Sequence, residues 1–196
     1  MAVANETKAR EIQRRINLFS KVNRTAVSLH NANPKLRKMT PIDWNDNEVQ
    51  AFLKSLYDND VQYLLVGGFA MAFHGYVRAT QDLDLWIKDD EFNLERLRKV
   101  LKEHGVAGID QMRSMDLVPG FTQFAIGESG FVIDPMKNLK AFSAYDFDAC
   151  YQRAEQGEYN GVKFKVIHAQ DFLKEKQATN RPKDQGDIEF LKSLDS

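Results

Sequence analysis

The sequence lacks several features that would point away from an ordinary globular protein. It has one cysteine, Cys150, which excludes an intrachain disulfide and a cysteine-cluster zinc site. No stretch approaches the roughly 20 apolar residues that a membrane-spanning helix needs. Residues 1–8 also lack the apolar core of a signal peptide. We therefore expect a cytoplasmic protein with no membrane contact and no redox chemistry.

Composition predicts one well-packed domain. The chain has 196 residues, of which 43% are hydrophobic and 28% are charged. Both fractions are near the averages for soluble proteins, and the length exceeds that of a typical single domain by little. A second independent catalytic domain is therefore not expected.

The net charge of −1 hides an asymmetry between the two ends of the chain. Residues 1–40 contain nine Lys or Arg and two Glu, a net charge of +7, which leaves −8 for residues 41–196. A basic arm of this kind is compatible with contact to RNA, because lysine and arginine release counterions from phosphates. It is also compatible with a helix that packs on the acidic body, or with a dimerisation arm, because basic arms are common and unspecific. The sequence leaves these interpretations open.

Hydrophobic periodicity predicts a mixed α/β (α+β) fold, in which helices flank a small mixed β-sheet. We predict a basic helical arm and linker over residues 1–40, followed by the main domain over residues 41–196. We expect helices near residues 8–29, 46–56, 69–76, 89–104, 171–178 and 183–194. We expect strands near residues 61–66, 81–87, 121–126, 130–133 and 162–167.

Two aspartates one residue apart form a candidate metal site. Residues i and i+2 of a strand point to the same face, so Asp82 and Asp84 project together while Leu83 faces the core. Two such carboxylates repel each other unless a cation lies between them, and Mg²⁺ suits carboxylate and phosphate oxygens. Trp86 shares their face, where it would either stack on a bound ring or pack in the core.

A third carboxylate is expected to complete such a site. Asp134 lies at the end of a predicted neighbouring strand, and Pro135 behind it favours extended backbone. Asp110 and Asp116, in a segment without clear periodicity, are the alternatives. Two metal ions held by three carboxylates would assist an in-line displacement at phosphorus.

A glycine pair between a predicted strand and a predicted helix is a candidate phosphate-binding turn. Gly67 and Gly68 would let the backbone approach an anion at a helix N-terminus. Their spacing matches neither the dinucleotide fingerprint nor the Walker pattern with its lysine. A tight turn without a ligand is the alternative interpretation.

Taken together, these motifs resemble the nucleotidyltransferase superfamily of the DNA polymerase beta type. The likeness is to its small bacterial members, such as lincosamide-modifying enzymes and the nucleotidyltransferase toxins of abortive-infection systems. It covers about residues 46–194 and leaves the arm outside. The motifs that carry it are Gly67-Gly68, Arg78-x-Thr80-x-Asp82-x-Asp84, Asp134, Lys176, Arg181-Pro182-Lys183-Asp184 and Asp187.

The resemblance implies roles for these residues. Asp82 and Asp84 would bind two Mg²⁺ ions, with Mn²⁺ as an alternative, and Asp134 would bridge one ion and deprotonate an acceptor hydroxyl. Gly67 and Gly68 would hold the triphosphate of a nucleoside triphosphate. These assignments imply transfer of a nucleoside monophosphate to a hydroxyl with release of pyrophosphate, a reaction that depends on positioning and charge neutralisation.

Cations are expected to assist the glycine pair. Gly68 and the residue after it offer no hydroxyl, which many superfamily members place there to contact phosphate. The resemblance implies that Arg78 lies near the triphosphate, and Lys176 and Lys183 would supply further cations, so all three are candidate nucleotide-binding residues. Arg181 would pair with Asp184 or Asp187. The alternative for this C-terminal group is a pair of salt-bridged surface helices.

The identity of the acceptor stays open at this point. A small molecule, a protein or an RNA end would each provide a hydroxyl. The alternatives to an active transferase of this kind are a nucleotide-binding or regulatory module that has lost turnover, and a toxin of a toxin–antitoxin pair that acts on tRNA. A homodimer is also compatible with the sequence.

Overall fold

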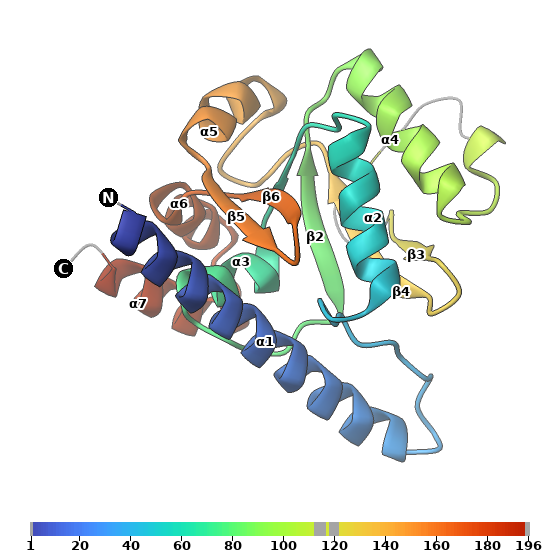
Figure 1. The fold of residues 1–196 in the computed structure, drawn as a ribbon, viewed down its shortest axis with the longest axis horizontal. Helices are drawn as coiled ribbons and strands as arrows, with labels where there is room; N and C mark the ends of the chain where they lie inside the picture. Colours follow the sequence, from blue (N-terminus) through green and yellow to red (C-terminus); the bar gives the residue numbers. More distant parts are fainter. Residues whose placement is uncertain (1, 112–116, 118–121, 195–196) are drawn as a thin grey trace.

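A six-stranded sheet forms the centre of the computed structural model, which describes residues 2–111, 117 and 122–194. The strand order is β3-β4-β2-β1-β6-β5, and helices surround the sheet (Figure 1). The β2–β4 and β1–β6 pairs are parallel, whereas the β1–β2, β3–β4 and β5–β6 pairs are antiparallel. The predicted mixed α/β class is therefore confirmed.

The strands are short, and most are bounded by turns. Their bounds are Tyr63–Leu65 (β1), Asp82–Ile87 (β2), Phe124–Ile126 (β3), Phe131–Met136 (β4), Glu155–Tyr159 (β5) and Val162–Val166 (β6). β4 runs past the expected strand end, so Asp134 lies inside it. Pro135 is tolerated there because β3 pairs only with residues 131–133 and no ladder bond to β3 is lost.

Apart from the helix over residues 147–153, which was not expected from the sequence, the described helices follow the predicted apolar periodicity. Their bounds are Ala2–Ala32 (α1), Asn47–Asp58 (α2), Gly67–His74 (α3), Glu91–Glu103 (α4), Phe147–Arg153 (α5), Ala169–Thr179 (α6) and Gln185–Ser193 (α7). Aspartates cap two of them: Asp46 accepts the Glu48 N–H at 2.7 Å, and Asp90 accepts the Asn93 N–H at 2.9 Å. Three short 3₁₀ segments are Ile109–Gln111, Ala144–Asp146 and Pro182–Asp184.

Strand β5 was not expected from the sequence. Its residues are mostly polar, because β5 is an edge strand that pairs only with β6. Gly157 leaves space for a core ring from β6, since a Cβ at this position would lie 2.3 Å from Cε2 of Phe164.

Helix α1 packs on the body of the protein rather than extending away from it (Figure 1). Ile16 and Phe19 are fully buried, and the Phe19 ring meets the Phe69 ring of α3 edge-on at 5.4 Å. Burial of each side chain contributes about 1.5–3 kcal/mol relative to exposure. The inner face of α1 therefore shares a core with the domain that follows it.

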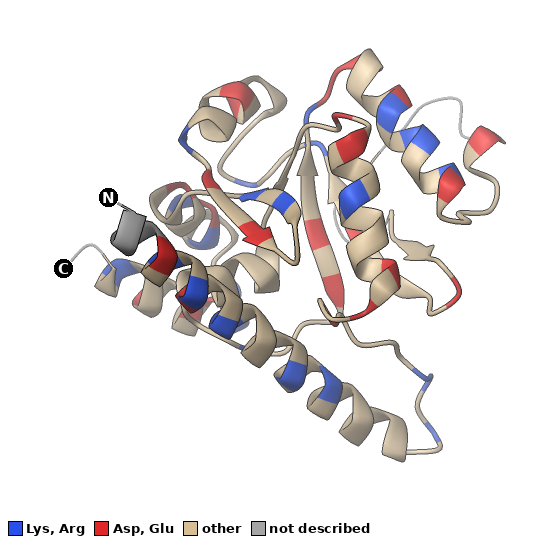
Figure 2. Cartoon of the chain, in the orientation of Figure 1, with Lys and Arg blue, Asp and Glu red and all other residues tan. Residues whose placement is uncertain are grey.

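The basic residues of α1 are spaced along the helix (Figure 2). Some of them pair with acids elsewhere in the protein. Lys8 contacts Glu155 of β5 at 3.1 Å, and Arg24 pairs with Asp43 beyond the helix. These contacts match the interpretation of the arm as a helix that packs back on an acidic body. Among the described helices, none is both long enough and apolar enough to cross a membrane.

Candidate active site

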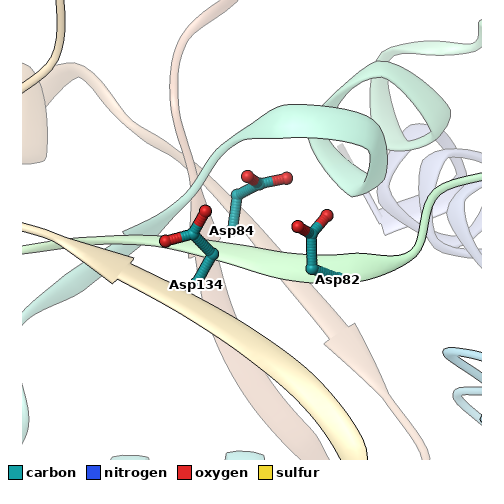
Figure 3. A group of neighbouring side chains, drawn as sticks. All are labelled: Asp82, Asp84 and Asp134. Carbon is teal, nitrogen blue, oxygen red and sulfur yellow. The ribbon is translucent and has the colours of Figure 1, made fainter. Parts of the chain in front are cut away.

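Three aspartates from two adjacent strands converge at one place on the sheet (Figure 3). Asp82 and Asp84 lie two residues apart on β2, and Asp84 is the direct partner of Asp134 in the parallel β2–β4 pair. One carboxylate oxygen of each residue lies within 4.8 Å of those of the other two. We call Asp82, Asp84 and Asp134 the carboxylate cluster.

The carboxylate cluster is electrostatically crowded. Burial, together with the negative charges of Asp82 and Asp134, raises the pKa of Asp84 from 3.8 to about 7. Lys176 and a hydrogen bond from the Gly68 backbone act in the opposite direction but do not cancel the increase. Without a cation, Asp84 therefore holds its proton over much of the acidic range.

The glycine turn brings the backbone directly against this cluster. Gly67 has φ of +59°, a left-handed conformation that favours glycine, and a Cβ there would lie 1.7 Å from Oδ2 of Asp84. A Cβ at Gly68 would lie 2.7 Å from Cβ of Thr80. Both glycines are thus required by close approach, and α3 begins at Gly67 rather than at the expected Phe69.

A cleft of about 470 Å³ opens beside the cluster. Its lining includes Gly67, Asp84 and Asp134 together with the basic residues Lys140 and Arg181. Its volume falls in the usual range for small-ligand sites, about 300–1,000 Å³. A larger groove of about 1210 Å³ lies between the first half of α1, the end of α2 and the β5–β6 hairpin, and none of the three aspartates lines it.

The C-terminal basic residues form a network with two aspartates. Lys176 Nζ lies 3.0 Å from Asp184 Oδ1 and 2.8 Å from Asp187 Oδ2, and the lysine side chain is 4% exposed. Arg181 pairs with Asp184 at 2.7 Å, one of the two pairings expected for it. Arg78 chelates Asp187 through two hydrogen bonds of 3.0 Å. We call these five residues the C-terminal ion network.

Charge compensation in this network shifts the pKa values of its aspartates downward. Burial alone would raise the pKa of Asp184, but hydrogen bonds from Arg181 and Lys176 hold it well below the usual range. Burial likewise acts against Asp187, whose pKa is lowered by hydrogen bonds from Arg78 and Lys176. The network is largely buried, in contrast to the surface helix pairing considered from the sequence.

The candidate nucleotide-binding residues are placed differently from one another. Gly67 and Lys176 line the cleft, although the lysine ammonium already binds two aspartates. Arg78 lies outside the cleft lining, bound to Asp187, but its charge acts on Asp84. Lys183 is exposed on the Pro182–Asp184 segment, and none of the described residues forms an ion pair with it.

Three other residues considered from the sequence lie away from the cluster or outside the described residues. Asp110 is bound to Lys102 at 2.7 Å, and Asp116 lies outside the part of the chain that the structure describes. Trp86 is fully buried, and its Nε1 donates to the Lys137 carbonyl at 3.0 Å. Packing in the core, the second of its two interpretations, is therefore correct.

Two residues at the site were missed by sequence reasoning. Gln123 donates from Nε2 to Oδ2 of Asp82 at 3.0 Å, and no sequence signal marks it. Asn23 of α1 accepts the Thr80 N–H at 2.9 Å. The only sequence signal of Asn23 is its position four residues after Phe19, which continues the stripe of Ile16 and Phe19.

A family model described as "Nucleotidyl transferase of unknown function (DUF2204)" matches residues 45–196. This range includes every described strand, the carboxylate cluster and the C-terminal ion network, but it leaves α1 outside. Among curated proteins, no significant match was found.

Proposed function

Because the chain belongs to this family of nucleotidyl transferases, we propose that it transfers a nucleoside monophosphate from a nucleoside triphosphate to a hydroxyl group. The observation that carries the proposal is the carboxylate cluster beside a glycine turn that a side chain would block. Few reactions other than phosphoryl or nucleotidyl transfer need both features together.

The donor set suits a hard divalent cation. Asp82, Asp84 and Asp134 offer carboxylate oxygens, which Mg²⁺ and Mn²⁺ prefer. The raised pKa of Asp84 reflects repulsion that a bound cation would relieve. These three residues would hold two Mg²⁺ ions, which supply neutralisation of charge on the reacting phosphate oxygens.

The protein groups at the cleft would carry the remaining steps. Asp134 would accept the proton of the acceptor hydroxyl. The hydroxyl oxygen would then bond to the α-phosphorus, while the bond from the α-phosphorus to the oxygen that bridges it to the β-phosphate breaks and pyrophosphate leaves. Lys140 and Arg181, which line the cleft, would bind triphosphate charge. Phe172 and Leu139 line the same cleft and offer apolar surface to a base.

The decisive experiment compares Asp134→Asn with the wild type and with a matched control, Asp110→Asn. Asp110 is an exposed aspartate paired with Lys102, away from the cluster. Pyrophosphate release is measured with each nucleoside triphosphate, Mg²⁺, and a clarified cell extract as the source of acceptors. We expect Asp134→Asn to lose at least about 100-fold in rate and Asp110→Asn to be unchanged.

A second measurement separates an active transferase from a binding module. Calorimetry with Mn²⁺ and a non-hydrolysable nucleoside triphosphate analogue reports binding independently of an acceptor. Binding without pyrophosphate release would identify a nucleotide-binding module. If neither ligand binds, and Asp84→Asn behaves like the wild type toward Mn²⁺, the proposed function is wrong.

A further inference from the structure

Helix α1 lies outside the region that the family model matches. We propose that it nevertheless supports the site, and that Asn23 is the residue of α1 that positions a loop beside the cluster. Asn23 would fix the loop of residues 76–81 and, through Thr80, the carboxylate of Asp82. The inference rests on the proposed function only in its consequence for metal binding. The contacts that carry it belong to the described residues of this chain.

Asn23 holds two segments at once from a fully buried position on α1. Its Nδ2 donates to the Ile42 carbonyl at 3.1 Å, and its Oδ1 accepts the Thr80 N–H at 2.9 Å. An amide side chain provides the donor and the acceptor that these two backbone groups need. A buried polar residue in an otherwise apolar stripe requires such partners, and here one partner belongs to the loop that leads into β2.

Thr80 connects the loop that Asn23 holds to the carboxylate cluster. Its hydroxyl donates a long hydrogen bond of 3.3 Å to Oδ1 of Asp82. Its side chain also occupies the space beside Gly68 that a Cβ would fill. Because Gln123 donates to Oδ2, both oxygens of Asp82 are oriented by protein groups. A shift of Thr80 would therefore change both the carboxylate and the contact with the glycine turn.

Helix α1 also holds the other segment that flanks the cluster. Nη1 of Arg15 donates to the Phe73 carbonyl at 2.8 Å, at the C-terminal end of α3. Phe19, one turn further along α1, packs edge-on against Phe69 near the start of α3. In Figure 1, α1 accordingly lies alongside α3, whose first residues form the glycine turn. The glycine turn and the Asp82 loop are thus braced by one helix.

Ser20 supplies a matched control on the same helix. It is fully buried, and its Oγ accepts the Trp44 N–H at 2.9 Å. Ser20→Ala, like Asn23→Ala, leaves a backbone N–H without its side-chain partner, so both variants are expected to lose stability. Only the Asn23 contact belongs to the loop that precedes Asp82.

The experiment uses the full chain with Asn23→Ala, Ser20→Ala and Thr80→Val. Mn²⁺ affinity is measured by calorimetry well below the melting temperature, and amide hydrogen exchange is measured for peptides that cover residues 76–82. We expect Asn23→Ala to weaken Mn²⁺ binding about tenfold and to speed exchange in this loop. Ser20→Ala should stay within about twofold of the wild-type affinity, with normal exchange in the loop.

Thr80→Val tests the second link without disturbing the first. It keeps the N–H that Asn23 accepts and removes the hydroxyl that meets Asp82. We expect it to weaken Mn²⁺ binding with loop exchange near that of the wild type, and to be non-additive with Asn23→Ala in the double variant. This variant also keeps the inference testable if Asn23→Ala does not fold.

Three outcomes would overturn the inference. They are equal loss of Mn²⁺ affinity in Asn23→Ala and Ser20→Ala, unchanged loop exchange in Asn23→Ala, and unchanged affinity in Thr80→Val. A wild-type chain that binds neither Mn²⁺ nor the nucleotide analogue would instead refute the proposed function. The exchange comparison would then still decide whether Asn23 positions the loop.

Discussion

The carboxylate cluster and the C-terminal ion network are both rich in aspartate, yet the pKa of aspartate shifts in opposite directions in the two regions. In the cluster, three carboxylates meet, and burial together with the charges of Asp82 and Asp134 raises the pKa of Asp84 to about 7. In the network, three cations surround two aspartates, whose pKa values fall. Crowding of like charges, rather than burial of charge as such, therefore distinguishes the cluster from the network, and it is the reason why we propose the cluster as the cation site.

The two regions are also coupled, because Lys176 interacts with aspartates of both. It neutralises Asp184 and Asp187 by direct contact, and its charge also lowers the pKa of Asp84. The network thus moderates the electrostatic crowding of the cluster through Lys176.

The largest expected effect comes from removing the cation at the centre of the network. Lys176→Met should destabilise the protein by about 3–5 kcal/mol, because it leaves two buried aspartates without their shared partner. Lys174→Met, on the same helix, removes an exposed lysine 3.7 Å from Asp171 and should cost less than about 0.5 kcal/mol. Chemical denaturation without metal measures both. Equal losses would show that the network is not a stabilising unit.

A smaller effect on stability, with a larger one on metal binding, is expected at the glycine turn. Gly67→Ala and Gly130→Ala both place a side chain at positive φ, at a cost of about 1–2 kcal/mol. At Gly130 an added Cβ meets nothing within 4 Å, whereas at Gly67 it meets Asp84. We therefore expect only Gly67→Ala to lose Mn²⁺ affinity in calorimetry. Wild-type Mn²⁺ affinity in Gly67→Ala would show that displacing Asp84 does not affect metal binding.

The smallest expected effect concerns how the free energy of unfolding depends on pH, because the two regions contribute to it with opposite sign. A raised pKa means that folded protein binds the Asp84 proton more tightly than unfolded protein does. The free energy of unfolding should therefore decrease as pH rises from about 4 to 7, by about 1–2 kcal/mol for this partly exposed group. The aspartates of the network have lowered pKa values, so their contribution is lost only below about pH 4.

Asp84→Asn isolates this contribution in urea denaturation carried out across the pH range. We expect the decrease between pH 4 and 7 to be smaller in this variant than in the wild type and in Asp110→Asn. Saturating Mg²⁺ should remove it from the wild type as well. An identical pH dependence in all three proteins would contradict the crowding inferred for the cluster.

The parts of the site that depend on local spacing could be predicted from the sequence. The alternation over residues 81–87 correctly put Asp82 and Asp84 on one face of a strand, and the glycine pair correctly marked a strand-to-helix turn. Asp134 was also selected, although its meeting with Asp84 depends on a parallel pairing that no local pattern specifies.

The remaining features depend on tertiary contacts. The sequence could not decide whether Lys176 faces a ligand or two aspartates, because that depends on how α6 and α7 pack. β5 was missed since an edge strand needs few apolar residues. Asn23 was missed because a polar residue on a helix is expected to be exposed until its partners, Ile42 and Thr80, are known.

The hydrogen bond between Asn23 and Thr80 has a consequence for the order in which the protein is made. The two residues are separated by 57 positions, so α1 leaves the ribosome well before the loop that it holds. The glycine helix α3, in which nearly every side chain is buried, emerges between them. During synthesis α1 is therefore available as a docking surface for these apolar residues as they appear. A chain that began at residue 45 would have to complete the same site without that support.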